Sequence, residues 1–278
     1  LRSLESHERS VRSQGGQDGI LAEVFSHIGT TNRFFVEVGF NTEGFEQGSN
    51  TYYWHEQGWN GVMFDAAHGP NTSIGLVRAF LTPETITAEL KDAGVPPEPD
   101  YVSIDIDSQD LWLLRALLAP DSGYRPRVVT VEYNAHFPIG AMYTLRPGRA
   151  YGWDGFDLAY GAAAGALRRV AESAGYRVVY LVGHLDMVLV RGDILDALQL
   201  PKGCEIPYAS FSLRGGTELH HCVTDPERRG LWLDYDRFES SGGDVPESLR
   251  AATESFHLNS FADGGHHLSA ACLGFHGL

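Results

Sequence analysis

Short apolar runs alternate with amphipathic stretches along residues 19–191. In the stretch 19–29 the apolar residues recur at helical spacing and the stretch ends on glycine, which predicts a helix. Short continuous apolar runs bounded by turn residues predict buried strands. By these criteria the helices are 19–29, 50–59, 82–90, 111–120 and 161–175, and the strands are 34–40, 61–66, 100–107, 127–134, 176–182 and 186–191.

Strands that are apolar throughout and alternate with helices indicate a mostly parallel sheet with helices on both faces, an α/β fold. We expect one main domain over residues 1–200. Residues 201–278 form a C-terminal extension with apolar content but no lasting period, apart from a short helix expected after Asp244, with Pro246 in its first turn. Three roles stay open for this extension: a lid over the strand ends, an addition to the sheet, or a dimer contact.

The predicted strands end in polar residues, in the sequences VEVGFN, MFDA, SIDID and VEYN. In open α/β sheets, ligands bind beyond the carboxyl ends of the strands. Glycine at Gly39, and again at Gly44 and Gly48, lets the backbone turn sharply and approach a ligand closely. The candidate ligand-binding residues at these ends are Glu37, Gly39, Asn41, Gly44, Asn50, Asp65, Ala66 and Asp105.

The first strand end differs from a phosphate-binding loop. It has neither the GxGxxG pattern nor a lysine, and Glu37 precedes the turn, so a cationic ligand is favoured. Asp65 follows Gly39 by 26 residues, about where an acid receives the ribose hydroxyls of an adenosine ligand. An adenosine that carries an amino acid and a positive charge, S-adenosylmethionine, fits this pattern. The alternative is that Gly39 and Asp65 meet only the ordinary needs of an α/β fold.

Five segments in order carry a resemblance to a known family. They are SQGGQDGILAEVFSHIG, FFVEVG, SNTYYWHEQGWNGVMFDA, DYVSIDIDSQDLWLLRAL and RPRVVTVEYN, and together with the following strands they span residues 13–193. This pattern resembles the FkbM-like group of S-adenosylmethionine-dependent methyltransferases. The resemblance implies a seven-stranded Rossmann-like sheet and methylation of a hydroxyl oxygen. It also implies that Glu37 and Gly39 form the first-strand motif, that Asp65 binds ribose, and that Asp105 lies near the methionine end. The loop FNTEGFEQG after Gly39 is bulkier and more acidic than the usual family pattern.

The acids Asp105, Asp107 and Asp110 form a cluster in the sequence DIDSQD. Two carboxylates on one face repel each other unless a cation or a proton lies between them. Asp105, Asp107 and the side chain of Asn134 on the next strand end are candidate Mg²⁺ ligands, and such an ion would lower the pKa of an acceptor hydroxyl. The alternative is that Asp107 and Asp110 cap the helix that follows.

His136, just past the fourth predicted strand end, is the candidate general base, because histidine titrates near neutral pH. Glu132 would orient His136 or the substrate, and Asp107 completes the set of candidate catalytic residues. A solvated histidine is the alternative. The paired histidines of 220–221 and 266–267 have no HxxxH or HxH spacing, which argues against a preformed transition-metal site.

The composition limits the kinds of binding partner that we expect. The 278 residues include 36 acids and 21 bases, a formal net charge of −15, and no run of Lys or Arg exceeds two residues, so we expect no nucleic-acid partner. No apolar run approaches the roughly 20 residues of a membrane span. The three cysteines show no CxxC spacing, although one disulfide stays open. A soluble cytoplasmic protein is the default expectation; because the chain begins at Leu1 rather than Met, a removed targeting segment is the alternative.

Two classes of function remain. One is an O-methyltransferase for a small, hydroxylated, neutral or cationic molecule, assisted either by Mg²⁺ or by His136. The other is a binding module that keeps the fold while the altered loop after Gly39 accepts another ligand. A metal-dependent reaction without methyl transfer, based on Asp105 and Asp107, is a further enzyme alternative.

Overall fold

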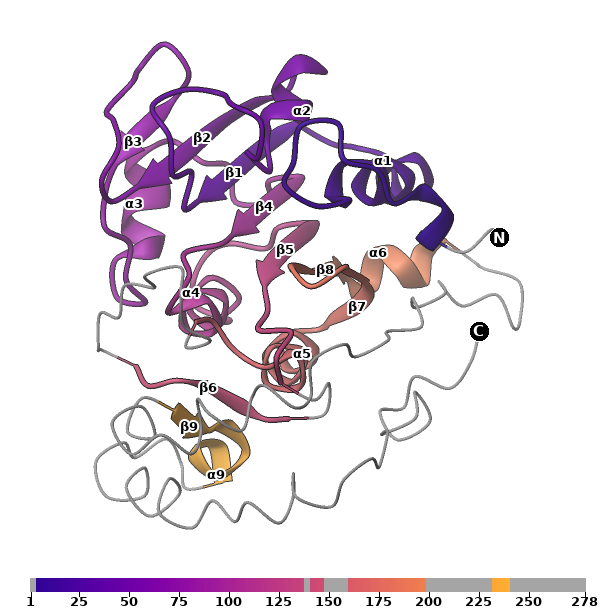
Figure 1. Cartoon of the computed structure of the whole chain (residues 1–278), viewed down its shortest axis with the longest axis vertical. Coiled ribbons are helices and arrows are strands. Elements are labelled where there is room, and N and C mark those ends of the chain that lie inside the picture. Colours follow the sequence, from indigo (N-terminus) through magenta and orange to yellow (C-terminus); the bar gives the residue numbers. More distant parts are fainter. Residues whose placement is uncertain (1–3, 138–140, 148–159, 199–231, 241–278) are drawn as a thin grey trace.

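A computed structural model describes residues 4–137, 141–147, 160–198 and 232–240 (Figure 1). The helices are η1 (Leu4–His7), α1 (Gln17–Ile28), α2 (Tyr52–Glu56), α3 (Ile86–Asp92), α4 (Asp110–Leu117), α5 (Ala164–Ser173), α6 (Gly192–Ala197) and α9 (Tyr235–Ser240). The strands are β1 (Phe34–Val38), β2 (Asn60–Asp65), β3 (Leu76–Arg78), β4 (Tyr101–Ile104), β5 (Val128–Glu132), β6 (Tyr143–Leu145), β7 (Tyr176–Val182), β8 (Asp186–Arg191) and β9 (Trp232–Asp234).

The central sheet has seven strands in the order β3-β2-β1-β4-β5-β8-β7. All neighbours pair in parallel except β8, which is antiparallel to both β5 and β7. This arrangement confirms the predicted α/β fold with a mostly parallel Rossmann-like sheet. The carboxyl ends of six strands, and the turn between β7 and β8, therefore lie at one edge of the sheet.

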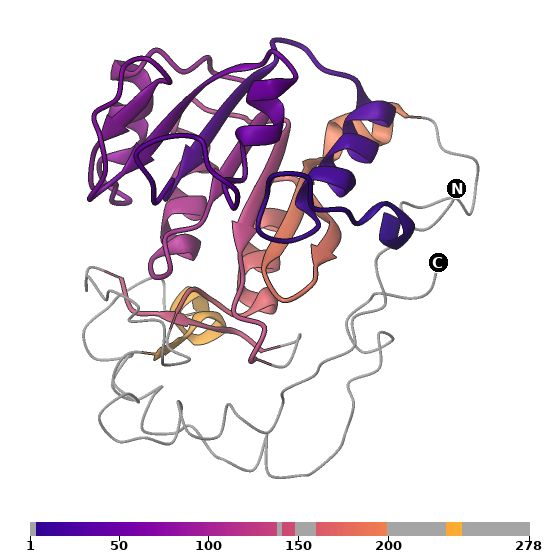
Figure 2. The ribbon, with the colours of Figure 1, turned by 45° about the horizontal axis from the view of Figure 1, so that its top comes forward.

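Helices cover both faces of the sheet, as predicted (Figures 1 and 2). Alternate residues of each strand point to opposite faces, so each strand contributes to two cores. On one face, side chains such as Val36, Val102 and Leu189 pack with α3, α4 and α5. On the other face, side chains such as Phe35 and Val188 pack with α1, α2 and α6. Both faces of the sheet are thus buried, and a ligand can approach it at the ends of the strands.

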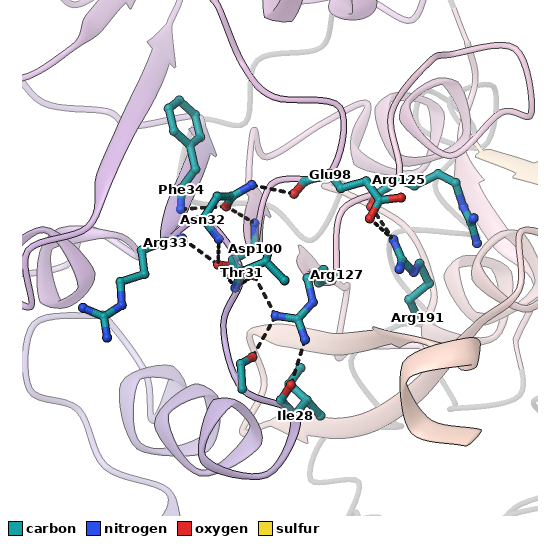
Figure 3. A network of polar contacts seen from close by, with 11 residues as sticks. Ile28, Thr31, Asn32, Arg33, Phe34, Glu98, Asp100, Arg125, Arg127 and Arg191 are labelled. Atoms are coloured by element: carbon teal, nitrogen blue, oxygen red, sulfur yellow. Dashed lines mark hydrogen bonds and ion pairs between the residues drawn. The ribbon is translucent and has the colours of Figure 1, made fainter. Parts of the chain in front are cut away.

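The amino edge of the sheet is closed by a buried ion pair (Figure 3). The Asp100 carboxylate accepts hydrogen bonds from the N–H groups of Thr31, Asn32 and Arg33, which tie the α1–β1 loop to the start of β4. Arg127, 7% exposed, donates to Asp100 over 2.7 Å and to the last carbonyl groups of α1. This network anchors the edge opposite the candidate ligand site.

Four elements named here differ from the sequence-based predictions. The seventh strand, β3, has only three residues, too few for a periodic pattern, and α6 and β6 were likewise not predicted. The third helix begins at Ile86 rather than at residue 82, because residues 83–85 form a turn before it.

Residues 232–240 are the described part of the predicted C-terminal extension. Strand β9 pairs antiparallel with β6, and Phe238 packs edge-on against Trp112 of α4 with ring centroids 5.2 Å apart. This part of the extension therefore belongs to the core on the α4 side. The helix expected after Asp244 and the other predictions for 201–278 lie outside the described residues. No helix within the described ranges combines the length and the apolar character needed to cross a bilayer.

Candidate functional site

A cleft of about 740 Å³ opens at the carboxyl edge of the sheet. Its walls are the loop after β1 and the ends of β2, β4 and β5, together with segments around Phe80, Tyr160 and His184. The volume lies within the range of small-molecule sites, about 300 to 1,000 Å³. The cleft therefore occupies the position at which the sequence predicts a ligand.

Acidic side chains dominate this cleft. Six carboxylates lie among its described lining residues, and no Lys or Arg does: Glu37, Glu46, Asp65, Asp105, Asp107 and Glu132. Side chains an even number of residues apart on a strand point to the same face of the sheet. Glu37, Asp65 and Glu132 are each related in this way to a side chain of their own strand that packs under α1 and α2, so all three point to that face. A ligand that carries positive charge is favoured here, and a polyphosphate is disfavoured.

Gly39 makes the turn off β1 with a φ of 90°. A Cβ atom at this position would lie 1.6 Å from the carbonyl oxygen of Asp105. Glycine is therefore required by the close approach of the β1 and β4 strand ends, which is a different reason from the direct ligand approach expected from the sequence. Gly48 and Asn41 line the cleft, but Gly44 does not.

The Glu37 carboxylate holds the loop that leads into α2. It accepts hydrogen bonds from the hydroxyl of Ser49, the N–H of Asn50, and both the N–H and the hydroxyl of Thr51. Burial raises the pKa of Glu37 to about 7, although these hydrogen bonds favour the charged form. Glu37 lines the cleft, but its main contacts are to the protein, so it positions the loop more than it offers a free acceptor.

Asp65 is also engaged by the protein. Its Oδ1 accepts the N–H groups of Ala67 and His68 and lies 2.9 Å from the His68 ring. Within the described part of the chain, Oδ2 accepts one hydrogen bond, from the N–H of Asn41 over 2.7 Å. Burial opposes ionisation, but the hydrogen bonds from His68, Ala67 and Asn41 outweigh it and lower the pKa of Asp65. Asp65 is therefore ionised at neutral pH, and Oδ2 keeps one lone pair for a ligand hydroxyl.

A buried polar chain reaches the cleft at one residue, Asn50. Gln17 donates through Nε2 to Asp186 over 2.7 Å and to the side chain of Asn50 over 3.3 Å. Asn50 in turn donates to the hydroxyl of Ser103, which also accepts the hydroxyl of Thr130. Asn50, a predicted ligand-binding residue, thus connects α1 with β4 and β5 beneath the cleft.

The segment after β4 is shaped by Asp110. The Asp110 carboxylate accepts the N–H groups of Ile106 and Ser108, and burial raises the pKa of Asp110 to about 7. Asp107 lies between these residues with a φ of 56°, a conformation that Asp tolerates better than most residues. Asp110 is the first residue of α4 and braces the turn before the helix, but the N-cap position is Gln109 and no side-chain hydrogen bond caps the helix. Asp107 lines the cleft.

Asp105, Asp107 and Glu132 bring their oxygen atoms within 4.8 Å of one another. Burial, followed by the charges of Asp105, Asp110 and Asp107, raises the pKa of Glu132 to about 12. Burial and then the charges of Asp186 and Asp110 also hold the pKa of Asp105 well above its usual range. The cluster thus stores electrostatic repulsion that a proton or a cation would relieve.

The third predicted metal ligand, Asn134, has a different role. Its side chain donates to the carbonyl of Tyr160 over 2.9 Å and accepts the N–H of His136 over 3.0 Å. Asn134 is fully buried and does not line the cleft. Glu132 lies two residues earlier, at the end of β5, and its carboxylate, not the Asn134 side chain, lies beside those of Asp105 and Asp107.

The predicted general base, His136, is not among the residues that line the cleft in the described part of the chain. Its ring packs edge-on against Tyr160, with centroids 6.1 Å apart, and Tyr160 forms the cleft wall. Among the described residues His136 thus lies behind Tyr160, and Asp107 is a carboxylate that lines the cleft itself.

Several cleft residues were not singled out from the sequence. Phe80 is 66% exposed, an unusual position for a large apolar side chain, and it follows β3, the short strand that no pattern predicted. His184 and Leu185 come from the three-residue turn between β7 and β8. The sequence did contain a signal for this turn, namely the short distance between the two predicted strands. Only antiparallel strands can be joined by so few residues, and the turn of such a hairpin lies at the carboxyl end of its first strand.

Comparisons with known proteins leave the family open. No family model matches the chain, and no curated protein matches it.

Proposed function

We propose that this protein is an S-adenosylmethionine-dependent methyltransferase that transfers a methyl group to a hydroxyl oxygen of a small neutral or cationic molecule. The observation that carries the proposal is the cleft at the carboxyl edge of the sheet, which has six lining carboxylates and no lysine or arginine among its described residues. A ligand with a sulfonium and an ammonium group complements such a cleft. The resemblance of the sequence to FkbM-like methyltransferases points to the same donor.

The chain's own residues fit this donor at three places. Asp65 is ionised and keeps an acceptor position at Oδ2 for a ribose hydroxyl. Phe80, which like Ala66 lines the cleft, offers an exposed aromatic face for a base. Asp105 at the end of β4 supplies negative charge for the aminoacyl end. Asn41 and Gly48 line the same wall, and Glu37 with Asn50 holds its loop in position.

The donor, when bound, supplies a methyl group on a positively charged sulfur. The protein must then orient an acceptor hydroxyl and receive its proton. Asp107 is the carboxylate available in the cleft for this purpose, and burial raises the pKa of Asp107, which makes it a stronger base than an ordinary carboxylate. Glu132, with a pKa of about 12, keeps its proton at neutral pH and can orient the acceptor hydroxyl. We accordingly transfer the role of general base from His136 to Asp107.

A second candidate is a binding module with the same fold. It is favoured by the contacts of Glu37 and Asp65, whose oxygens already accept most of their hydrogen bonds from the protein's own loops. Such a module would bind a cationic small molecule without methyl transfer. A metal-dependent enzyme without methyl transfer remains the third candidate, based on the acids near Asp105.

Isothermal titration calorimetry with S-adenosylmethionine tests the proposal, with NAD⁺ as an anionic adenosine control. We expect binding of the first compound and none of the second. Phe80→Ala should weaken binding about fivefold or more, since stacking on an aromatic side chain contributes about 1 to 3 kcal/mol. Val11→Ala is the matched control, because Val11 is a partly exposed apolar residue outside the cleft. Equal binding of NAD⁺, or no binding of S-adenosylmethionine, would contradict the proposal.

A further inference from the structure

Three carboxylates from two strand ends converge in the cleft. Asp105 and Asp107 follow β4, Glu132 ends β5, and the ligand atoms of all three lie within 4.8 Å of one another. No Lys or Arg lines the cleft among the described residues, so no permanently charged cation described there neutralises the group. Acidic clusters alone are common on protein surfaces, and a ligand requires separate evidence.

Glu132 supplies that evidence. Its side chain is 6% exposed, and its Oε2 atom is buried without a hydrogen-bond partner among the residues that the structure describes. Buried carboxylate oxygens almost always accept a hydrogen bond or bind a cation, because desolvation without compensation is costly. Glu132 also lines the cleft, and one of its carboxylate oxygens belongs to the cluster with Asp105 and Asp107.

The segment that carries Asp107 is fixed before any ligand arrives. Asp110 accepts the N–H groups on both sides of Asp107, at 2.8 Å from Ile106 and 3.0 Å from Ser108. Asp105 is held by its N–H, which donates to the carbonyl of Val38 over 3.0 Å. The three carboxylates are thus presented by rigid strand ends and by a braced turn, which favours a specific ion over a diffuse counterion cloud.

Ligand type and spacing define the ion. The cluster offers carboxylate oxygens only, which favours hard cations such as Mg²⁺, Mn²⁺ and Ca²⁺ over zinc or copper. Two oxygens on opposite sides of Ca²⁺ lie about 4.6 to 5.2 Å apart, and those around Mg²⁺ about 4 Å, so a 4.8 Å span admits either ion with small side-chain movements.

We propose that Asp105, Asp107 and Glu132 form a binding site for one hard divalent cation, with water or substrate oxygens completing its coordination. The site differs from the set expected from the sequence, because Glu132 replaces Asn134. Ion binding itself does not require the proposed methyl transfer; only a role for the ion in orienting an acceptor hydroxyl rests on that function.

Electron paramagnetic resonance with Mn²⁺ alone tests the site, because the free aqua ion loses its sharp signal when it binds. We expect one Mn²⁺ per chain, displaced by excess Mg²⁺ or Ca²⁺. Glu132→Gln and Asp107→Asn should each weaken Mn²⁺ binding by about tenfold or more, as removal of one charged ligand does. Glu46→Gln is the matched control, since Glu46 lines the same cleft outside the cluster, and it should change binding less than about twofold.

Two outcomes would overturn the proposal. One is a wild-type protein that leaves the Mn²⁺ signal unchanged, which would mean that a proton rather than a metal ion relieves the repulsion. The other is weakening by Glu46→Gln as large as by Asp107→Asn, which would mean diffuse attraction. Cooperative thermal unfolding verifies that each variant is folded, and Asp107, which is partly exposed, keeps the test valid if the Glu132 variant does not fold. Because no methyl donor is present, the result is independent of the proposed function.

Discussion

Glu132 on β5 and Asp186 on β8 lie directly opposite each other on neighbouring antiparallel strands. Each has one buried carboxylate oxygen without a hydrogen-bond partner among the described residues. Burial raises the pKa of Asp186 to about 6 and, together with the neighbouring acids, that of Glu132 to about 12, so at neutral pH Glu132 keeps a proton while Asp186 is ionised. Keeping two buried acids at this edge therefore costs stability. Such a cost is typical of functional sites, where local groups are arranged for a ligand and not for the fold.

Removing one charge of this pair should stabilise the protein. Asp186→Asn keeps an oxygen for the hydrogen bond from Gln17 and removes a buried charge, whose burial raises the pKa of Asp186 to about 6. We expect the free energy of unfolding at pH 8, without divalent cations, to rise by about 1 kcal/mol or more, since one pKa unit corresponds to about 1.4 kcal/mol. Urea denaturation measures the change, and Asp121→Asn, an exposed acid elsewhere, should leave it unaltered. A less stable Asp186 variant would show that the pair is not under strain.

The ion pair at the amino edge should be essential for stability. Asp100→Asn leaves Arg127 buried without its charged partner, which typically costs about 3 to 5 kcal/mol. Asp196→Asn breaks the exposed pair with Arg177 and should cost less than about 1 kcal/mol. Both are measured by chemical denaturation at pH 7. Equal losses in the two variants would mean that burial of the Asp100 pair has no energetic consequence.

Glu37 should make stability depend on pH. Its pKa in the folded protein, about 7, exceeds the ordinary value of 4.5, so the folded state binds the proton more tightly than the unfolded state does. This stabilisation is complete below pH 4.5 and is lost as the pH rises through about 7, a change of roughly 3 kcal/mol.

Glu37→Gln removes this titration and leaves that of the neighbouring Asp105 in place. The variant should therefore become more stable relative to the wild type as the pH rises from about 5 to about 8. Denaturation curves at several pH values give this difference directly. Parallel pH profiles for the two proteins would contradict the assigned pKa shift of Glu37.

Much of the fold followed from local pattern. The spacing of apolar residues predicts six strands and five helices. Asp65 and Asp105 were identified as site candidates because each directly follows an apolar run. The direction of β8 was not assigned, although three residues between β7 and β8 permit only a hairpin. Strand β3 was missed because three residues at a sheet edge carry no period.

The contacts of the site could not be predicted in the same way, because they join residues far apart in the chain. Glu37 binds donors 12 to 14 residues later, and Gln17 reaches Asp186 across 169 residues. The choice between Glu132 and Asn134 depends on which side chain the β5 end turns toward the cleft. It also depends on the neighbouring segment at Tyr160, whose carbonyl group accepts a hydrogen bond from the Asn134 side chain.

The central claim, that the acidic cleft at the carboxyl edge binds the methyl donor, is tested most directly by a crystal structure with S-adenosylhomocysteine at saturating concentration. We predict electron density for the compound along the ends of β1, β2 and β4, with a ribose hydroxyl on Asp65 Oδ2 and the adenine against Phe80. Density at another surface, or a cleft that contains only water at saturation, would contradict the claim.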